Sequence, residues 1–274
     1  MNILVIGGGG REHAIVKKLK ESKKTDALYC LPGNAGIAED AICLDGKATD
    51  FGRVKAAVKE HNIDLVFVAP DDPLSLGLVD ELNRIGVRAF GPVKAAARLE
   101  GSKAYSKDFM RRHGIPTAAY ECFSDYETAL GYIKTADYPL VLKADGLALG
   151  KGVLICKSEP EAEEGLKKLM LDRAFGDSGN TVVVEEFLTG REVTVLAFTD
   201  GKTVKCMPSS QDHKRAYDGD EGLNTGGMGA FAPSPYFTPE LFAEAEKNIF
   251  IPTIEGLRAD GVIYKGVIYF GLMM

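Results

Sequence analysis

The stretch ILVIGGGGREHA, residues 3–14, predicts a strand, a tight glycine turn and the start of a helix. The β-branched run Ile3–Ile6 is typical of a buried strand, and the helix is expected from about Glu12. The alternation continues, with strands expected at ALYC (27–30) and DLVFVAP (64–70) and helices near 51–61 and from Leu74. Strands and helices that alternate in this way predict βαβ units and a parallel sheet, so the fold class is α/β.

A change of pattern near Gly91 and Pro92 divides the chain. Its 274 residues, 45% of them hydrophobic, are enough for two buried cores. Beyond the change, amphipathic strands and hairpin-like pairs replace the βαβ rhythm, with strands expected at 181–188, 191–198 and 202–208. We place the boundary between 92 and 102 and expect a parallel-sheet, Rossmann-like domain at 1–100 and an α+β region at 101–274.

Two helices of the second part are predicted from capping boxes. The pairs are Ser124 with Glu127 and Ser158 with Glu161. Each serine hydroxyl is expected to accept a hydrogen bond from the backbone N–H of the glutamate three residues on, which fixes the first turn of the helix.

Charge, hydropathy and cysteine content exclude several classes. The net charge is −6 without a long basic block, so no nucleic-acid partner is expected. The first apolar run is too short for a signal peptide or a membrane span, so no membrane partner is expected either. The five cysteines are odd in number and scattered, without a zinc spacing, and this favours a reducing cytoplasm: Cys30, Cys43, Cys122, Cys156 and Cys206.

The glycine turn at 7–10 fails as a dinucleotide fingerprint. Gly7 and Gly9 fit, but Glu12 stands where the third glycine should pack helix against strand. The acidic residue that would bind the ribose is also missing, because the second strand ends at Leu31-Pro32. A helix N-terminus beside Arg11 still favours an anion such as a phosphate, and the alternative is a plain strand-to-helix turn.

The glycine-rich loop KADGLALGKGV, residues 143–153, joins two predicted adjacent strands and carries a lysine near each end. It lacks the order of a Walker loop, since no Ser or Thr and no helix follow the second lysine. Backbone N–H groups of such a loop can still cover a polyphosphate while Lys143, in the sheet, supplies a point charge. A nucleotide lid is one interpretation, and a solvated lysine hairpin is the other.

The stretch VVVEEFLTGREV, residues 182–193, supplies the parts of an adenosine pocket. An acidic pair at a strand end offers a carboxylate and a backbone carbonyl for an exocyclic amine, Phe187 and Leu188 offer apolar contacts for a ring, and Glu192 offers a carboxylate for ribose hydroxyls. With the lysine loop, this hinge indicates ATP.

These motifs resemble the ATP-grasp superfamily, in which the nucleotide lies between two α+β lobes. The polar loop SSQDHKRAYDGDEGLNTGGMGAFAP at 209–233 narrows the resemblance, together with GGGGREHA, PGNAG (32–36) and LEGSKAYSK (99–107). Over essentially the whole chain, the sequence is similar to the phosphoribosylamine–glycine ligase family.

The resemblance implies a reaction in which ATP phosphorylates glycine and the amine of 5-phosphoribosylamine displaces phosphate to form an amide. It implies a cytoplasmic enzyme with ATP and Mg²⁺ (Mn²⁺ as the alternative), and a nucleotide lid lobe at about 118–188. The implied nucleotide contacts, of which Lys103 and Lys143 would also be catalytic, are Lys103, Lys143, Gly150, Lys151, Gly152, Glu185, Glu186, Phe187, Leu188 and Glu192. The implied substrate contacts are Gly9, Gly10, Arg11, Gly33, Asn34, Asp71, Asp212, Lys214, Asn224, Thr225, Gly226 and Gly227.

Two departures separate the chain from the family pattern. Where the family reads Gly-Pro-Glu-x-Pro-Leu, this chain has Asp71, one methylene shorter. The sequence also stops at YFGLMM (269–274), within an apolar run that reads as an unfinished strand, before the Glu and Asn that hold Mg²⁺ in the family. We therefore expect metal ligands to lie beyond Met274, apolar surface to be exposed over 262–274, and nucleotide binding to persist without turnover.

Three alternatives remain. Another ATP-grasp carboxylate–amine ligase is disfavoured by the QDHKR and GGMGAFAP stretches. A non-catalytic nucleotide-binding fragment is favoured only by the missing metal ligands. A nicotinamide-dependent oxidoreductase is disfavoured by the failed dinucleotide fingerprint. His213 is left out of the catalytic set, because a lone loop histidine is more often a hydrogen-bonding strut.

Overall fold

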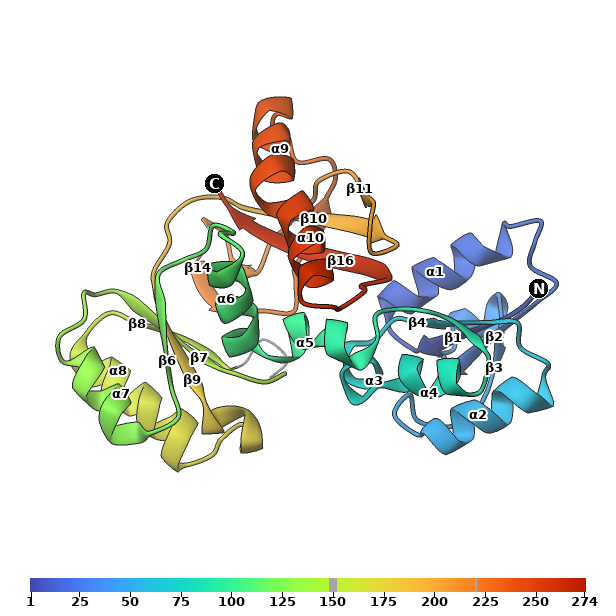
Figure 1. Cartoon of the computed structure of the whole chain (residues 1–274), viewed down its shortest axis with the longest axis horizontal. Helices are drawn as coiled ribbons and strands as arrows, with labels where there is room; N and C mark the ends of the chain where they lie inside the picture. The colour runs from blue at the N-terminus through green and yellow to red at the C-terminus, as the bar shows by residue number, and fades with distance from the viewer. Residues whose placement is uncertain (148–151, 220) are drawn as a thin grey trace. The chain divides into compact units, whose positions relative to one another are not determined.

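The structure, a computed structural model, describes residues 1–147, 152–219 and 221–274 (Figure 1). The chain divides into two compact units, each treated by itself below. The first unit comprises Met1–Arg98 and Val262–Gly266, and the second comprises Leu99–Gly261 and Val267–Met274. Among the described helices, none is long and apolar enough to cross a membrane.

The first unit is built on a five-stranded parallel sheet, so the α/β fold class predicted for this part is confirmed. The strand order is β3-β2-β1-β4-β5, and the strands span Asn2–Gly7 (β1), Ala27–Pro32 (β2), Ile42–Cys43 (β3), Leu65–Val68 (β4) and Arg88–Phe90 (β5). The helices are α1 (Gly10–Lys20), η1 (Ile37–Glu39), α2 (Phe51–Glu60), α3 (Asp71–Leu76), α4 (Leu78–Arg84) and α5 (Lys94–Gly101).

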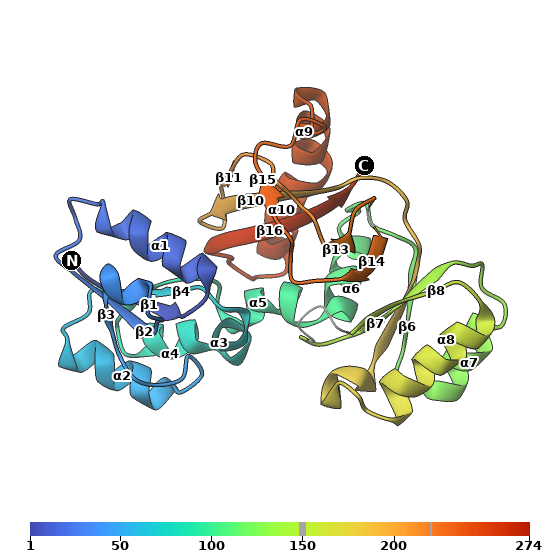
Figure 2. The same ribbon diagram turned by 180° about the vertical axis from the view of Figure 1, so that it is seen from behind.

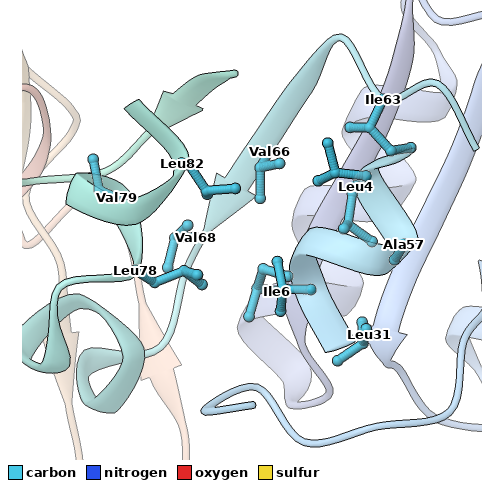
Figure 3. Packing of buried hydrophobic residues seen from close by; sticks show 12 residues of the cluster. Leu4, Ile6, Leu31, Ala57, Ile63, Val66, Val68, Leu78, Val79 and Leu82 are labelled. Atoms are coloured by element: carbon cyan, nitrogen blue, oxygen red, sulfur yellow. The ribbon is translucent and has the colours of Figure 1, made fainter. Parts of the chain in front are cut away.

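Alternation along the central strand β1 gives this sheet two buried faces. Leu4 and Ile6 pack on one side in a cluster with residues of α2 and α4, drawn in Figure 3. Ile3 and Val5 pack on the other side with Val16 of α1. A parallel strand buried on both faces reads as a continuous apolar run, which is why ILVI carries no polar position.

The helix expected from Leu74 is wrong as a single helix. The chain forms α3 and α4, divided at Gly77, whose φ of 96° lies in the left-handed region. A side chain is strained in that conformation, so glycine ends the first helix there.

The second unit contains a four-stranded antiparallel sheet with helices α7 and α8 on one face (Figures 1 and 2). The strand order is β6-β9-β7-β8, and the elements are α6 (Lys103–Arg112), β6 (Tyr120–Phe123), α7 (Tyr126–Ile133), β7 (Leu140–Ala144), β8 (Val153–Cys156), α8 (Glu159–Leu166), η2 (Lys167–Leu171), η3 (Gly176–Asn180) and β9 (Val182–Glu186). As predicted, the glycine-rich loop joins two adjacent strands, β7 and β8.

The remaining elements follow β9. They are β10 (Glu192–Thr199), β11 (Val204–Cys206), β12 (Gln211–Asp212), β13 (Arg215–Tyr217), β14 (Glu221–Asn224), β15 (Ala230–Phe231), α9 (Pro239–Ala245), η4 (Glu246–Phe250), α10 (Ile251–Ala259) and β16 (Gly266–Met273). Strand β16 lies beside β10, with Phe270 packed on Phe250 at 4.6 Å between ring centroids. In the 262–274 segment Ile263 and Tyr269 are more than half exposed.

Both predicted capping boxes are wrong in detail. Asp125, not Ser124, caps α7, because its carboxylate accepts the Thr128 backbone N–H at 2.8 Å. Ser158 does occupy the cap position of α8, but no described backbone N–H donates to its hydroxyl. The Glu161 carboxylate instead accepts from the backbone N–H of Lys157 at 2.8 Å.

The two faces of the β7–β8 hairpin should respond differently to truncation. Leu142 is fully buried against α7 and α8, so we expect Leu142→Ala to lower the free energy of unfolding by about 2 to 5 kcal/mol. The matched control Ile155→Ala, on the opposite and more exposed face, should lower it far less. Urea unfolding followed by circular dichroism measures both, and equal losses would contradict the assignment of the core face.

Candidate functional site

One face of the sheet β6-β9-β7-β8 is left free of the helices α7 and α8. The side chains of Leu140, Leu142 and Ala144 enter the core with the helices, so Val141 and Lys143 of β7 point to the opposite face. Their register partners Ile155 and Val153 of β8 are 38% and 37% exposed there. This open face therefore combines an apolar floor with a lysine.

Glu185 of β9 is the buried carboxylate of the open face. It is the register partner of Val141, and its side chain is only 6% exposed. Its Oε2 accepts from Lys143 Nζ at 2.7 Å and lies 3.3 Å from Lys107 Nζ of α6. Two ammonium groups thus share one carboxylate oxygen, which leaves the trio with an excess positive charge.

Lys107 is the more deeply buried of these cations, with a side chain 8% exposed. Its Nζ also donates to Thr117 Oγ1 at 2.8 Å and to the Ala118 carbonyl at 3.3 Å, and it lies 5.4 Å from the Tyr120 ring centroid. Burial lowers the pKa of Lys107, and the charge of Glu185 acts in the opposite direction.

Asp145 fixes the start of α6 next to this pair. Its carboxylate accepts from Ser102 Oγ at 3.0 Å and from the Ala104 backbone N–H at 2.7 Å, and its carbonyl accepts from the Lys103 N–H at 3.0 Å. A carboxylate at a helix N-terminus is favoured by the free N–H groups and the positive end of the dipole. The first turn of α6 is therefore tied to the end of β7.

Lys103 is placed by this anchor. Its Nζ donates to the Gly146 carbonyl at 2.9 Å. Burial lowers its pKa, Asp145 and Glu100 oppose this, and the charge of Lys143 lowers it further. An anion placed beside Lys103 and Lys143 would offset the free-energy cost of burying the Lys103 charge and would reduce the repulsion between the two ammonium groups. A polyphosphate supplies such a negative charge.

The hinge after β9 exposes apolar side chains beside the cluster. Glu186 Oε1 accepts from the Ala119 backbone N–H at 2.8 Å, and the Glu186 N–H donates to the Ala119 carbonyl at 3.0 Å. Phe187 and Leu188 follow, 37% and 42% exposed. Exposed apolar groups at a strand end next to cations suit a ligand with a flat ring and a charged tail.

Glu192 and Lys214 form an ion pair at the start of β10. Asp212 Oδ1 lies 3.9 Å from Lys214 Nζ. Burial acts to lower the pKa of Lys214, but the Glu192 hydrogen bond and both carboxylate charges outweigh it and raise that pKa. Three of the predicted contact residues are thus brought together.

The loop that follows β14 is held by backbone contacts. Thr225 Oγ1 donates to the Lys214 carbonyl at 2.9 Å and accepts from the Gly227 N–H at 3.0 Å, while Gly226 and Gly227 are exposed. The side chain of Asn224, and Gly150 and Lys151 with the central part of the predicted lid, lie outside the described residues. Gly152 is described, and its carbonyl accepts from the Ala144 N–H at 2.8 Å.

His213 is placed by its backbone and its ring. Its N–H donates to the Gly229 carbonyl at 2.9 Å, and its ring lies 5.5 Å from that of Phe231 between centroids.

In the first unit, Glu12 occupies the helix N-terminus at which an anion was expected. Its carboxylate, on a residue 6% exposed, accepts from the Gly9 N–H at 2.6 Å and completes a capping box. Glu12 stands at the third glycine position, and its side chain packs directly against the turn, since a Cβ on Gly7 would lie 2.6 Å from Glu12 Cγ. The failed dinucleotide fingerprint has this physical basis.

The other first-unit residues surround the same turn. Asn34 Nδ2 donates to the Gly8 carbonyl at 2.9 Å, and the Gly33 N–H donates to the Gly7 carbonyl at 3.0 Å. Arg11 donates to the Ala69 carbonyl at 3.1 Å and lies 3.6 Å from Asp71. Gly10 begins α1 and is exposed.

Two family models together match the whole chain. The N domain of phosphoribosylglycinamide synthetase matches residues 1–100, and the ATP-grasp (A) domain of the same synthetase matches residues 101–274. The chain belongs to the phosphoribosylglycinamide synthetase family.

Relatives in this family cover the chain in full. The phosphoribosylamine–glycine ligases of Streptococcus pyogenes serotype M6 and of Haemophilus influenzae are 48% and 46% identical to it over 100% of the chain. The crystal structure of phosphoribosylamine–glycine ligase from Thermotoga maritima superposes with a TM-score of 0.87 at 36% identity, covering 100% of this chain and 65% of that one. The chain spans 65% and 64% of the length of the two curated relatives.

More distant structures share the fold. Biotin carboxylase from Campylobacter jejuni superposes with a TM-score of 0.78 at 18% identity, covering 99% of this chain and 62% of that one. The ATP-grasp fold predicted for the second part is confirmed by the family match over residues 101–274 and by the Thermotoga maritima structure.

Sequence reasoning missed Lys107, Asp145 and the apolar pair Val153 and Ile155. Lys107 follows Lys103 by four residues, a spacing that puts both on one face of a helix but does not tell whether that face is buried. Alternation in GVLIC placed Val153 and Ile155 on the same face as Lys143, which was a usable signal.

The described residues do not by themselves provide a metal site. Across 1–147, 152–219 and 221–274, no three His, Cys, Asp or Glu side chains gather in a way that could hold a cation. The nearest carboxylates, Glu185 and Asp145, already accept hydrogen bonds from lysine or from the start of α6. This donor set does not suit Mg²⁺, which prefers several free oxygen ligands.

Asp145 should matter more than an ordinary helix cap. We expect Asp145→Ala to lower the stability of the second unit by about 1 to 2 kcal/mol and to speed hydrogen exchange at the amides of Ala104 and Tyr105. The matched control is Asp125→Ala, which removes the cap of α7 and should leave exchange in α6 unchanged. Slow exchange at Ala104 in the first variant would refute the anchoring role.

Proposed function

We propose that the second unit binds ATP on the open face of the sheet β6-β9-β7-β8. The observation that carries the proposal is the trio in which Lys143 and Lys107 share the buried Glu185 carboxylate, with Lys103 close by. The excess positive charge suits the triphosphate, and Val153, Ile155 and Leu188 offer apolar surface for the base.

The chain would then act in an ATP-dependent ligase that joins glycine to 5-phosphoribosylamine and forms glycinamide ribonucleotide, ADP and phosphate. This assignment draws on the activity for which the relatives are named, and we place the reaction in the cytoplasm. The glycine carboxylate would attack the γ-phosphorus of ATP to give glycyl phosphate, and the amine would then displace phosphate from that intermediate.

Lys103 and Lys143 have the clearest catalytic roles. In phosphoryl transfer the negative charge spreads over the oxygens of the transferred group, so fixed cations stabilise the transition state. Asp145 holds Lys103 in place through the start of α6, while Lys143 is held by the strand that carries it. The Lys103 ammonium group is thus positioned before the nucleotide arrives, which reduces the reorganisation that binding requires.

A divalent cation would supply further charge neutralisation when bound with the nucleotide. Mg²⁺ is proposed first, with Mn²⁺ as the alternative, because Mg²⁺ in proteins is commonly bound together with substrate phosphates. The described side chains do not by themselves form a site for this cation.

For the substrates, we propose the glycine turn of the first unit and the polar loops of the second. The turn would offer Gly9, Gly10, Arg11, Gly33, Asn34 and Asp71, and the loops would offer Asp212, Lys214, Asn224, Thr225, Gly226 and Gly227. Because Glu12 already accepts the Gly9 N–H, the phosphate would bind to Arg11 and the remaining free N–H groups.

Loss of the Lys143 cation should weaken ATP binding. We expect Lys143→Ala to raise the dissociation constant of ATP by roughly 10- to 100-fold, because a charge-assisted contact to phosphate is lost and Glu185 keeps only one cation. Lys134→Ala, which removes an exposed lysine after α7, is the matched control and should bind as the unaltered chain does. Calorimetric titration decides, and equal constants for all three proteins would reject the assignment.

Ligand specificity and turnover test the proposed function itself. ATP should raise the melting temperature of the chain in a saturable way and NADH should not, because only a ligand of the native state stabilises it. Formation of glycinamide ribonucleotide from ATP, glycine and 5-phosphoribosylamine, followed by mass spectrometry, tests the reaction. Stabilisation by NADH alone would reject the nucleotide site, and ATP binding without product in this chain extended to the length of its relatives would reject the ligase.

A further inference from the structure

Lys107 is a buried cation that reaches the nucleotide face from the second turn of α6. Its ammonium group contacts Thr117 Oγ1, the Ala118 carbonyl and Glu185 Oε2, at 2.8, 3.3 and 3.3 Å. These partners saturate its three N–H donors, so it has no donor left for a ligand. A direct contact between Lys107 and a bound nucleotide is therefore not expected.

Lys143 differs from Lys107 in exposure although both contact the same oxygen. Its side chain is 28% exposed, against 8% for Lys107 and 6% for Glu185. Lys143 can therefore turn from Glu185 towards an anion on the open face, whereas Lys107 is held by the segment that precedes β6.

A nucleotide whose phosphates attract the Lys143 ammonium group would break the contact between Lys143 and Glu185, leaving that carboxylate with one of its two cations. A buried carboxylate without a cation is strongly unfavourable, so the exchange needs a second positive charge that stays behind. The titratable groups that surround Glu185 are Lys103 and Lys107 of α6, Lys143 of β7, and Tyr120 and Cys122 of β6. Of these, Lys107 and Lys143 contact the carboxylate within 4 Å.

We propose that Lys107 is a positioning residue of the nucleotide site: it retains Glu185 in place when Lys143 leaves that carboxylate for the phosphates of ATP. Lys107 acts through Glu185 and does not touch the nucleotide. The inference rests on the proposed ATP site. It adds the residue that keeps the Glu185 carboxylate paired when Lys143 moves to the phosphates, so that the move does not leave a buried charge unpaired.

The test compares four variants of the 274-residue chain by calorimetric titration with ATP. Lys107→Met removes the charge at similar length, Lys107→Arg retains it, and Lys107→Met combined with Glu185→Gln removes the carboxylate as well. Lys134→Met is the matched control at an exposed position. Each titration is repeated in two buffers of different ionisation enthalpy, so that protons taken up on binding are counted. Thermal melts establish that each variant is folded.

We expect Lys107→Met to weaken ATP binding roughly 10- to 100-fold and to make binding take up protons, because Glu185 loses Lys143 to ATP and has no other contacting cation. Lys107→Arg should restore most of the affinity and abolish the uptake. The double variant should show no proton uptake and bind more tightly than Lys107→Met alone. A purely structural role would lower affinity without this buffer dependence and without rescue by Glu185→Gln.

Two results overturn the proposal in distinguishable ways. If the unaltered chain binds ATP and Lys107→Met binds it equally well, or more weakly without proton uptake, the role of Lys107 is refuted and the nucleotide site stands. If the unaltered chain binds no ATP, the nucleotide site and the role of Lys107 fall together.

Discussion

The contact on which the nucleotide face depends is the one between the Glu185 carboxylate and the ammonium groups of Lys143 and Lys107. Glu185 is nearly inaccessible to water, and leaving such a charge unpaired would destabilise the fold by about 3 to 5 kcal/mol. The pairing therefore constrains two elements at once, since Lys143 comes from β7 and Lys107 from α6. Asp145 ties the same two elements together at the start of α6, so the lysines and the sheet are held as one arrangement.

The two glycine-rich segments, the turn after β1 and the segment after β7, each lie beside a carboxylate that accepts backbone hydrogen bonds at a helix N-terminus. At the turn after β1, Glu12 satisfies the backbone with its own carboxylate and fills the space that a dinucleotide fingerprint would leave to glycine. At the end of β7, the Asp145 carboxylate accepts hydrogen bonds from Ser102 and Ala104 at the start of α6, and the neighbouring Gly146 carbonyl accepts one from Lys103 Nζ. In both cases a carboxylate of the chain occupies a helix N-terminus, but only Asp145 also positions a lysine, Lys103, whose ammonium group could bind an anionic ligand.

Many of the strands could be predicted from the sequence alone. A strand buried on both faces is a continuous apolar run, and a strand buried on one face alternates between apolar and polar residues. ILVI and DLVFVAP predicted strands β1 and β4 of the parallel sheet, whereas the shared face of Lys143 and Glu185 is set by the pairing of β7 with β9. Lys107, the cap at Asp125 and the break at Gly77 did not follow. Each depends on tertiary packing or on a choice between adjacent polar residues, which spacing alone leaves undecided.

The most direct test is ¹⁵N NMR of the lysine side-chain ammonium groups, assigned with single Lys→Arg variants, during titration with ATP. The account holds that Lys143 exchanges Glu185 for phosphate while Lys107 keeps it. It predicts large shifts for Lys143 and Lys103 and a Lys107 resonance that stays close to its starting position and remains protected from exchange with water. A Lys107 resonance that moves with ATP while Lys143 remains unchanged would contradict the account.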